Sequence, residues 1–138
     1  MIEHKFTFKS VEKLKSSKLI RQIFAEGESF SHFPFRVIFI FPEKNASFLQ
    51  AAFSVSSKKF KKAVDRNRLK RLMREAYRLQ KNSLWIELEE NQIYLAVFII
   101  YTGNELPLYE NVVDKMGGLL KRLEKIILGG NQQKQDAV

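Results

Sequence analysis

The chain has 138 residues, 45% hydrophobic and 28% charged, which fits one globular domain and excludes a wholly disordered chain. Cysteine is absent, which excludes disulfides, thiol catalysis and cysteine-ligated metal clusters, and the two histidines lack zinc-ligand spacing. The charge is unbalanced, because 24 Lys and Arg against 15 Asp and Glu give a net charge of +9. No apolar run is long enough to span a membrane.

Hydrophobic periodicity predicts six elements in the order α-β-β-α-β-α. The first is a helix over 15–24, with Ser16 or Ser17 as its N-cap and Gly27 as its end. Runs of β-branched and aromatic residues predict strands over 33–41 and 48–56, which we expect to pair as a hairpin.

The remaining elements are a helix over 63–81, a strand over 92–101 and a helix over 108–128, and the pattern over 85–90 fits no single element. This order predicts an α+β fold, a two-layer α/β sandwich with helices packed on one sheet. We expect a single domain over 1–128 and a flexible tail over 129–138.

The excess positive charge lies in one segment. Residues 58–81 contain 11 basic and two acidic residues, so this segment alone carries +9. On the predicted helix an apolar stripe lies mostly opposite a polar face. The stripe is Leu69, Leu72, Met73, Ala76 and Tyr77; the polar face is Asn67, Arg71, Arg74 and Arg78, with Lys62, Arg66 and Lys70 beside it.

A solvated helix face normally mixes acidic and basic residues, but this face has Glu75 as its single acid, near Arg71 and Arg78. The pattern therefore favours binding of a polyanion, and arginine can hold phosphate through two parallel hydrogen bonds. A membrane-surface helix would need an exposed bulky apolar face, and a helix-turn-helix reader of DNA would need a neighbouring helix instead of strands.

The aromatic residues give a second indication. Several of the 12 phenylalanines lie in or near the predicted hairpin, where core packing explains most of them, although aromatic rings on an open sheet can stack on single-stranded bases. For Phe24, stacking and core packing both stay open. The sequence contains no nucleophile elbow, catalytic triad or phosphate-binding glycine loop, so the polypeptide alone is not predicted to be an enzyme.

A strand end, Ser54-Val55-Ser56, is followed on the helix by Arg66-Asn67-Arg68, Lys70-Arg71 and Arg74-Glu75. This arrangement resembles the protein subunit of bacterial ribonuclease P, and the resemblance extends over roughly residues 6–126. The resemblance implies a left-handed β-α-β crossover, which departs from the usual handedness. It also implies that an RNA subunit is the catalyst, hydrolysing the phosphodiester that joins the 5′ leader to precursor tRNA. The resemblance further implies that Mg²⁺ ions, held mainly by the RNA subunit and the substrate, activate the water.

The resemblance also implies two groups of contacts. Those with the catalytic RNA are Lys62, Arg66, Asn67, Arg68, Lys70, Arg71 and Arg74. Those with the leader lie in a cleft between the first helix and the sheet, and they are Phe24, Ser54, Lys58 and Lys59. Two cleft positions that are often aromatic in the family are Ile20 and Ile38 here, which leaves Phe24 as the stacking candidate.

We therefore predict a single RNA-binding α+β domain that serves as the protein subunit of ribonuclease P in the cytoplasm. Its expected partners are the catalytic RNA and precursor tRNA, with no membrane and no obligate protein partner. The alternative is a ribosomal or general structured-RNA-binding protein without a catalytic role, which would show no preference for a leader. A membrane-surface protein is a third and weaker hypothesis.

Overall fold

The computed structural model describes residues 8–136, with side chains for residues 8–129. Residues 1–7 and 137–138, at the ends of the predicted domain and tail, lie outside this description. The elements are η1 (Ser10–Glu12), α1 (Ser17–Glu26), β1 (Glu28–His32), β2 (Phe35–Ile40), β3 (Leu49–Val55), α2 (Ala63–Gln80), α3 (Asn82–Glu90), β4 (Leu95–Tyr101) and α4 (Tyr109–Asp136). The predicted α+β fold is confirmed, with β1 and α3 as elements that the periodicity did not predict.

The four strands form one sheet in the order β1-β2-β4-β3. β2 pairs antiparallel with both β1 and β4, whereas β3 pairs parallel with β4. The predicted hairpin between 33–41 and 48–56 is therefore wrong, because β1 is the hairpin partner of β2. The sequence Glu-Ser-Phe-Ser-His of β1 has one large apolar residue, Phe30, so its alternation is too weak to identify a strand.

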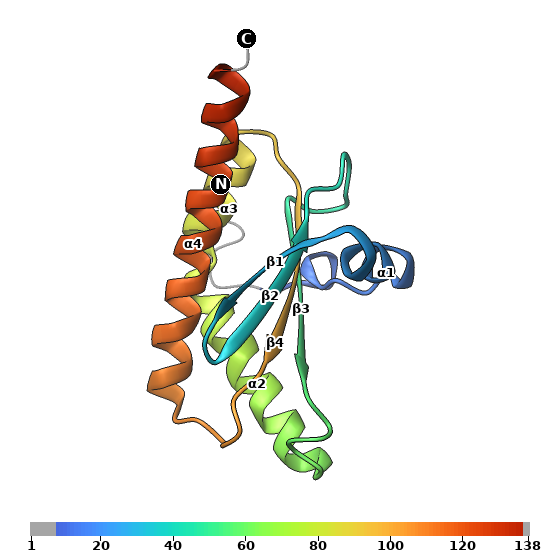
Figure 1. The fold of residues 1–138 in the computed structure, drawn as a ribbon, viewed down its shortest axis with the longest axis vertical. Coiled ribbons are helices and arrows are strands. Elements are labelled where there is room, and N and C mark those ends of the chain that lie inside the picture. The colour runs from blue at the N-terminus through green and yellow to red at the C-terminus, as the bar shows by residue number, and fades with distance from the viewer. Residues whose placement is uncertain (1–7, 137–138) are drawn as a thin grey trace.

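Helices lie on both faces of the sheet, with α2 and α4 on one face and α1 on the other (Figure 1). Val37 and Val97 belong to the main core with α2 and α4, whereas Ile38 and Phe98, one residue further along, pack with Ile23 of α1. Successive side chains of a strand point to opposite faces, so the central strand β4 is covered on both, as its continuous apolar run predicts.

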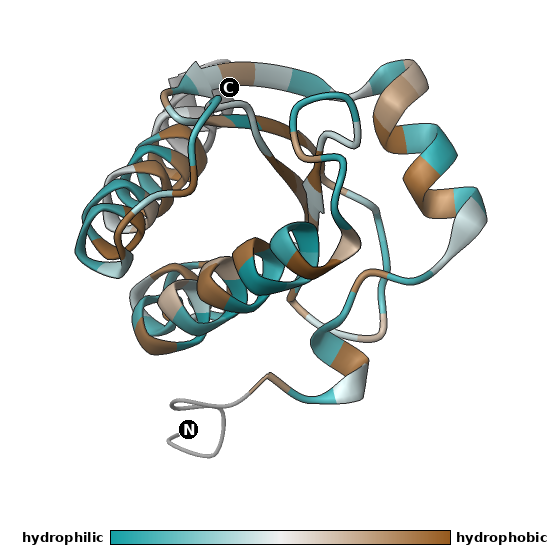
Figure 2. Cartoon of the chain, turned by 90° about the horizontal axis from the view of Figure 1, so that it is seen from below, coloured by the Kyte–Doolittle hydropathy of each residue, from teal (hydrophilic) through white to brown (hydrophobic). Residues whose placement is uncertain are grey.

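The two long helices are amphipathic, as predicted. Hydrophilic and hydrophobic segments alternate along their ribbons in Figure 2. Leu69, Met73, Ala76 and Tyr77 of α2 are buried, and Leu72 is half-buried against the same core. The polar face of α2 is therefore left for contacts outside the core.

α4 is longer than predicted, continuing past Leu128 to Asp136. Glycine disfavours a helix by about 1 kcal/mol relative to alanine but keeps its backbone hydrogen bonds, so Gly129-Gly130 does not end it. The segment predicted as a tail thus has helical backbone up to Asp136. Gly117 and Gly118, in the middle of α4, let α2 and β1 approach this helix closely. An added Cβ on Gly117 would lie 2.5 Å from Gln80 Oε1, and an added Cβ on Gly118 would lie 2.6 Å from His32 Nε2.

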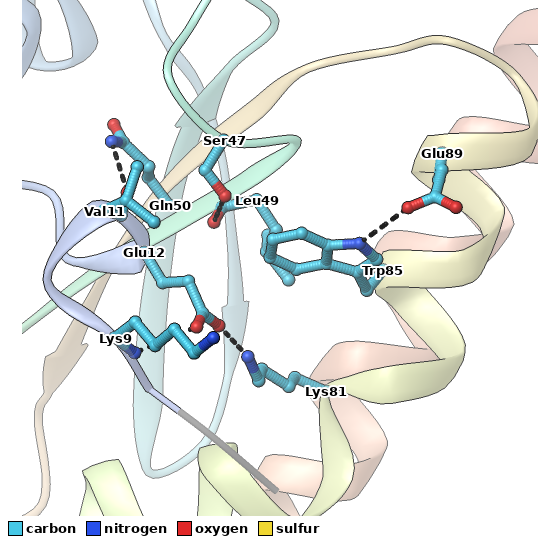
Figure 3. Close-up of polar contacts among 9 residues, drawn as sticks. All are labelled: Lys9, Val11, Glu12, Ser47, Leu49, Gln50, Lys81, Trp85 and Glu89. Atoms are coloured by element: carbon cyan, nitrogen blue, oxygen red, sulfur yellow. Dashed lines mark hydrogen bonds and ion pairs between the residues drawn. The ribbon is translucent and has the colours of Figure 1, made fainter. Parts of the chain in front are cut away.

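A buried ion pair joins η1 to the end of α2 (Figure 3). The side chains of Glu12 and Lys81 are both fully buried, and the backbone N–H of Lys9 donates to Glu12 Oε2 at 2.9 Å. Burial lowers the pKa of Lys81 to about 8, whereas the adjacent carboxylate favours its charged form. Lys81 therefore belongs to the interior, although the sequence places it in the basic segment.

Gly27 ends α1 where the chain turns into β1. An added Cβ would collide with the carbonyl oxygen of Ile23 and lie 3.0 Å from that of Phe39. We expect Gly27→Ala to lower the free energy of unfolding by about 1–3 kcal/mol, since neither backbone oxygen can rotate away. Gly129 is the matched control, because nothing lies within 4 Å of its added Cβ. Urea denaturation should show that Gly129→Ala is neutral or stabilising; equal losses in the two variants would contradict the steric explanation.

Candidate nucleic-acid interface

The 11 basic side chains of residues 58–81 fall into two groups. Four have partners inside the protein: Lys59, Arg66, Arg78 and Lys81. The other seven make no side-chain hydrogen bond or ion pair within the described part of the chain: Lys58, Lys61, Lys62, Arg68, Lys70, Arg71 and Arg74. We call these seven residues the free basic group.

The free basic group follows the end of β3 and extends along the first two thirds of α2. Arg68, Arg71 and Arg74 are exposed, together with Asn67, whereas Lys70 is half-buried. Asn67, Arg71 and Arg74 lie on the polar face that the periodicity predicts, with Lys70 beside it, and the opposite side of the helix packs in the core. A rigid helix thus holds guanidinium groups in solvent that no side chain within residues 8–129 pairs with, an arrangement suited to binding phosphates.

The last arginine of α2 is already neutralised. Arg78 donates to both carboxylate oxygens of Glu75, with Nη2 to Oε1 at 2.6 Å and Nε to Oε2 at 3.0 Å. The hydrogen bond from Arg78 lowers the pKa of Glu75, so this carboxylate is ionised at neutral pH. Glu75 therefore limits the basic surface at its carboxy-terminal end, and Arg71 and Arg74 have no partner among the described residues.

The loop before α2 is held in place by its own basic residues. Arg66 Nη1 donates to the backbone carbonyls of Phe60, at 2.8 Å, and Lys61, at 2.9 Å. Lys59 Nζ donates to the carbonyl of Thr102, just after β4, and the buried Phe60 ring packs against Tyr101. These contacts give Arg66 and Lys59 a structural role and fix the position from which Lys58, Lys61 and Lys62 reach solvent.

Arg66→Ala is expected to lower the free energy of unfolding by about 1–2 kcal/mol, because it removes two hydrogen bonds from a charged donor to the backbone. Arg68→Ala, which removes the same charge from an exposed side chain two positions along, should stay within about 0.5 kcal/mol of wild type. Urea denaturation of both variants provides the comparison. If Arg66→Ala is as stable as Arg68→Ala, Arg66 does not brace the loop.

Phe24 lies beside the sheet face that α1 only partly covers. It is 53% exposed, and its ring meets Phe98 edge-on with the ring centroids 5.0 Å apart. The strand register places Ile38, Phe98 and Ala52 in one row across this face and Arg36, Ile100 and Ser54 in the next. The structure therefore brings Phe24 and Ser54 to the same face of the sheet and leaves the ring of Phe24 half-exposed, outside the buried core.

The predicted leader contacts are not all equivalent. Lys58 is exposed and free, whereas Lys59 is held by Thr102. A cavity does lie between α2 and α4, next to Gln80, Tyr109 and Lys121, but none of the predicted site residues lines it.

A second group of cations lies around η1 and on α1, outside the basic segment 58–81. The residues outside 58–81 are neutral in sum, but their charges are unevenly placed: between residues 8 and 25 there are five basic residues and one acid, Glu12. Since Glu12 is buried against Lys81, it offsets no charge at this surface. The net charge within a short window over residues 9–21 reveals this group, whereas the total over all residues outside 58–81 conceals it.

Two further properties bear on function. No helix within residues 8–136 is long and apolar enough to cross a membrane. Over the same residues, no group of three or more His, Asp and Glu side chains is arranged to hold a metal ion.

Comparison with known proteins agrees with the resemblance seen in the sequence. The family model described as Ribonuclease P matches residues 8–124. The ribonuclease P protein component of Porphyromonas gingivalis is 38% identical over 119 residues, covering 86% of this chain and 87% of that protein. That of Clostridioides difficile is 31% identical and covers 85% of this chain and 96% of that protein.

Solved structures show the same fold. The RNase P protein of Staphylococcus aureus superposes with a TM-score of 0.66 at 19% identity, covering 81% of this chain and 94% of that one. The RNase P protein of Thermotoga maritima gives a TM-score of 0.60 at 25% identity, and the match covers 80% of this chain and 96% of that one. With a family match over most of its length and relatives above 30% identity, the chain belongs to the ribonuclease P protein component family.

Proposed function

We propose that the free basic group binds the catalytic RNA of ribonuclease P, and that the sheet face beside Phe24 binds the 5′ leader of precursor tRNA. Family membership makes the chain a subunit of ribonuclease P, the enzyme that processes tRNA, and makes ribonuclease P RNA its partner. The observation that carries the proposal is the set of seven unpaired cations on α2 and the loop before it. Nothing in the comparisons supports a ribosomal or general RNA-binding role.

The free basic group can act by bringing phosphates together. Where the catalytic RNA and its substrate meet, their backbones repel each other, and exposed arginines on a rigid helix lower that repulsion without having to reorganise. Two parallel N–H donors on each guanidinium also orient the phosphate that they bind. The protein's contribution is therefore to position the RNAs and stabilise their charge.

We propose that Mg²⁺ is held mainly by the RNA subunit and the substrate. A cytoplasmic location belongs to the same proposal, since the RNA partners of a bacterial ribonuclease P are found there.

Phe24 supports the leader part of the proposal. An aromatic ring that is half-exposed beside an apolar strand surface can stack on a base of any identity, because every base has a π-face. Ser54 lies one row away on the same sheet face and offers a hydroxyl to the sugar or phosphate. A single strand with exposed bases fits this surface better than a duplex, whose bases are stacked inside.

The test is cleavage of a precursor tRNA carrying a 5′ leader, with a compatible bacterial ribonuclease P RNA at low Mg²⁺ concentration, in the presence and absence of the protein. We expect correct cleavage only when the protein is added. The matched control is the protein with Lys115, Lys121 and Lys125, three exposed lysines of α4, changed to glutamine; this variant should restore cleavage as well as wild type does. RNA binding without any effect on cleavage would favour the general RNA-binding alternative.

A further inference from the structure

The group of cations around η1 and on α1 has no use in the function proposed above. Lys13, Lys15, Lys18 and Arg21 are all exposed, and Glu12, the one nearby acid of residues 8–25, is buried in its ion pair. Lys15 Nζ donates to the hydroxyl of Ser10 at 3.0 Å, whereas Lys18 has no partner within the described residues. This surface therefore carries a local positive charge that no carboxylate offsets.

Helix geometry places part of this charge next to Phe24. Each residue of an α-helix advances by about 100°, so Arg21 projects about 60° from Phe24 around the axis and Lys18 about 60° further. Ile20 and Ile23 lie on the other side of Phe24, toward the sheet, where they pack in the second core cluster. Around the axis of α1, starting from the side that faces the sheet, the order of side chains is therefore Phe24, Arg21 and Lys18.

The acidic end of α1 lies away from this path. Glu26 lies about 80° beyond Lys18 around the axis but about 12 Å further along it, and Gln22 donates to its carboxylate at 3.3 Å. Arg21 makes one long hydrogen bond, from Nε to the carbonyl of Ser17 at 3.4 Å, so its two Nη groups have no partner within the described residues. Arg21, beside Phe24, and Lys18, about 9 Å along the helix axis from it, thus have groups that are not engaged by the described residues and are available to a ligand.

We propose that Phe24, Arg21 and Lys18 form a track along which a single-stranded RNA leaves the sheet face and passes around the outside of α1. We call these three residues the α1 track. An aromatic ring followed by two unpaired cations matches a strand that offers a base and then phosphates, whereas a duplex offers phosphates alone. The proposal rests on the proposed function and extends it: the occupant is the part of the 5′ leader that lies furthest from the cleavage site.

The test compares Lys18→Gln/Arg21→Gln with wild type, using ribonuclease P RNA and precursor tRNAs that have either a short leader ending at Phe24 or a long leader reaching beyond α1. Since each lost contact with a single strand removes about 0.7 from the slope of log affinity against log salt, the double variant should lose about 1.4 for the long leader. From about 50 mM to about 200 mM salt, the advantage of wild type should therefore shrink about sevenfold. For the short leader, the two proteins should bind alike.

The matched control is Lys121→Gln/Lys125→Gln, which removes the same charge from α4 on the other face of the sheet. Equal losses for this control, or for the short leader, would show a general charge effect and overturn the α1 track. If the double variant binds the catalytic RNA more weakly than wild type does, by the same factor for both leader lengths, the surface binds that RNA instead. If the double variant binds the long leader as wild type does, and wild type restores cleavage, the α1 track is refuted. If wild-type protein does not restore cleavage, the proposed function itself is refuted.

Discussion

Glu12→Ala is expected to lower the free energy of unfolding by about 3–5 kcal/mol, a larger loss than we expect for Gly27→Ala or Arg66→Ala. The substitution leaves the ammonium group of Lys81 inside the protein without its counter-charge, and an uncompensated buried charge costs far more than a surface ion pair gains. Lys81→Met leaves the carboxylate of Glu12 buried without its counter-charge in the same way, so we expect a loss of similar size, even though the apolar side chain can fill the space beside Trp85.

The double variant Glu12→Leu/Lys81→Met separates charge from packing. It removes both charges together, so we expect it to be more stable than Glu12→Ala and close to wild type. Urea denaturation of the three variants gives the comparison, with the midpoint and the slope fitted separately. A loss below about 1 kcal/mol for Glu12→Ala would show that the ion pair adds little to stability and that η1 is held mainly by other contacts, such as the hydrogen bond from Gln50 to Val11.

The second large effect is on RNA binding. Changing Arg68, Arg71 and Arg74 together to alanine removes three exposed guanidinium groups that have no partner within the described residues. At about 0.9 per lost phosphate contact with a duplex, the slope of log affinity against log salt for ribonuclease P RNA should fall by about 2.7. The advantage of wild type should then shrink about fortyfold between about 50 mM and about 200 mM salt.

Two controls make this result specific. The triple lysine variant at the same positions keeps the charge and should keep the slope, but it should bind more weakly because lysine cannot form the paired hydrogen bonds of arginine. Changing Lys115, Lys121 and Lys125 of α4 to alanine removes equal charge elsewhere and should leave the slope near that of wild type. If the alanine variants on α2 and α4 behave alike, binding follows net charge and the free basic group is not the interface.

The elements with a strong pattern were predictable from the sequence. α2 has both a regular apolar stripe and a concentration of like charge, and β4 is apolar throughout, so each was placed to within a few residues. β1 and α3 were not predicted, because β1 has a single large apolar residue and α3 is short, with Leu84, Trp85 and Leu88 as its buried residues. The pairing of 33–41 with 48–56 was wrong for a different reason: strands that are consecutive in sequence need not be neighbours in the sheet, and β4 lies between β2 and β3.

The candidate site was predictable as a set of residues but not as a set of roles. The sequence identifies Arg66 and Arg71 as equal members of one motif, whereas their surroundings differ. Arg66 is held by two backbone carbonyls, and Arg71 is exposed without a partner in the described chain. Lys81 shows the same limit, since its partner Glu12 is distant in sequence and no local pattern reveals the pair. Roles depend on tertiary contacts, which periodicity does not contain.

The central position of β4 has a consequence for the order in which the protein can be built. β2 and β3 both pair with β4 and not with each other, and β4 follows them in the chain, after α2 and α3. During synthesis these strands therefore wait for residues 95–101 to leave the ribosome, with apolar surface exposed. A nascent or truncated chain that ends before Leu95 has α2 but no complete sheet beneath it. The helix that carries the free basic group can therefore pack on a complete sheet, with its polar face toward solvent, only after most of the polypeptide has been synthesised.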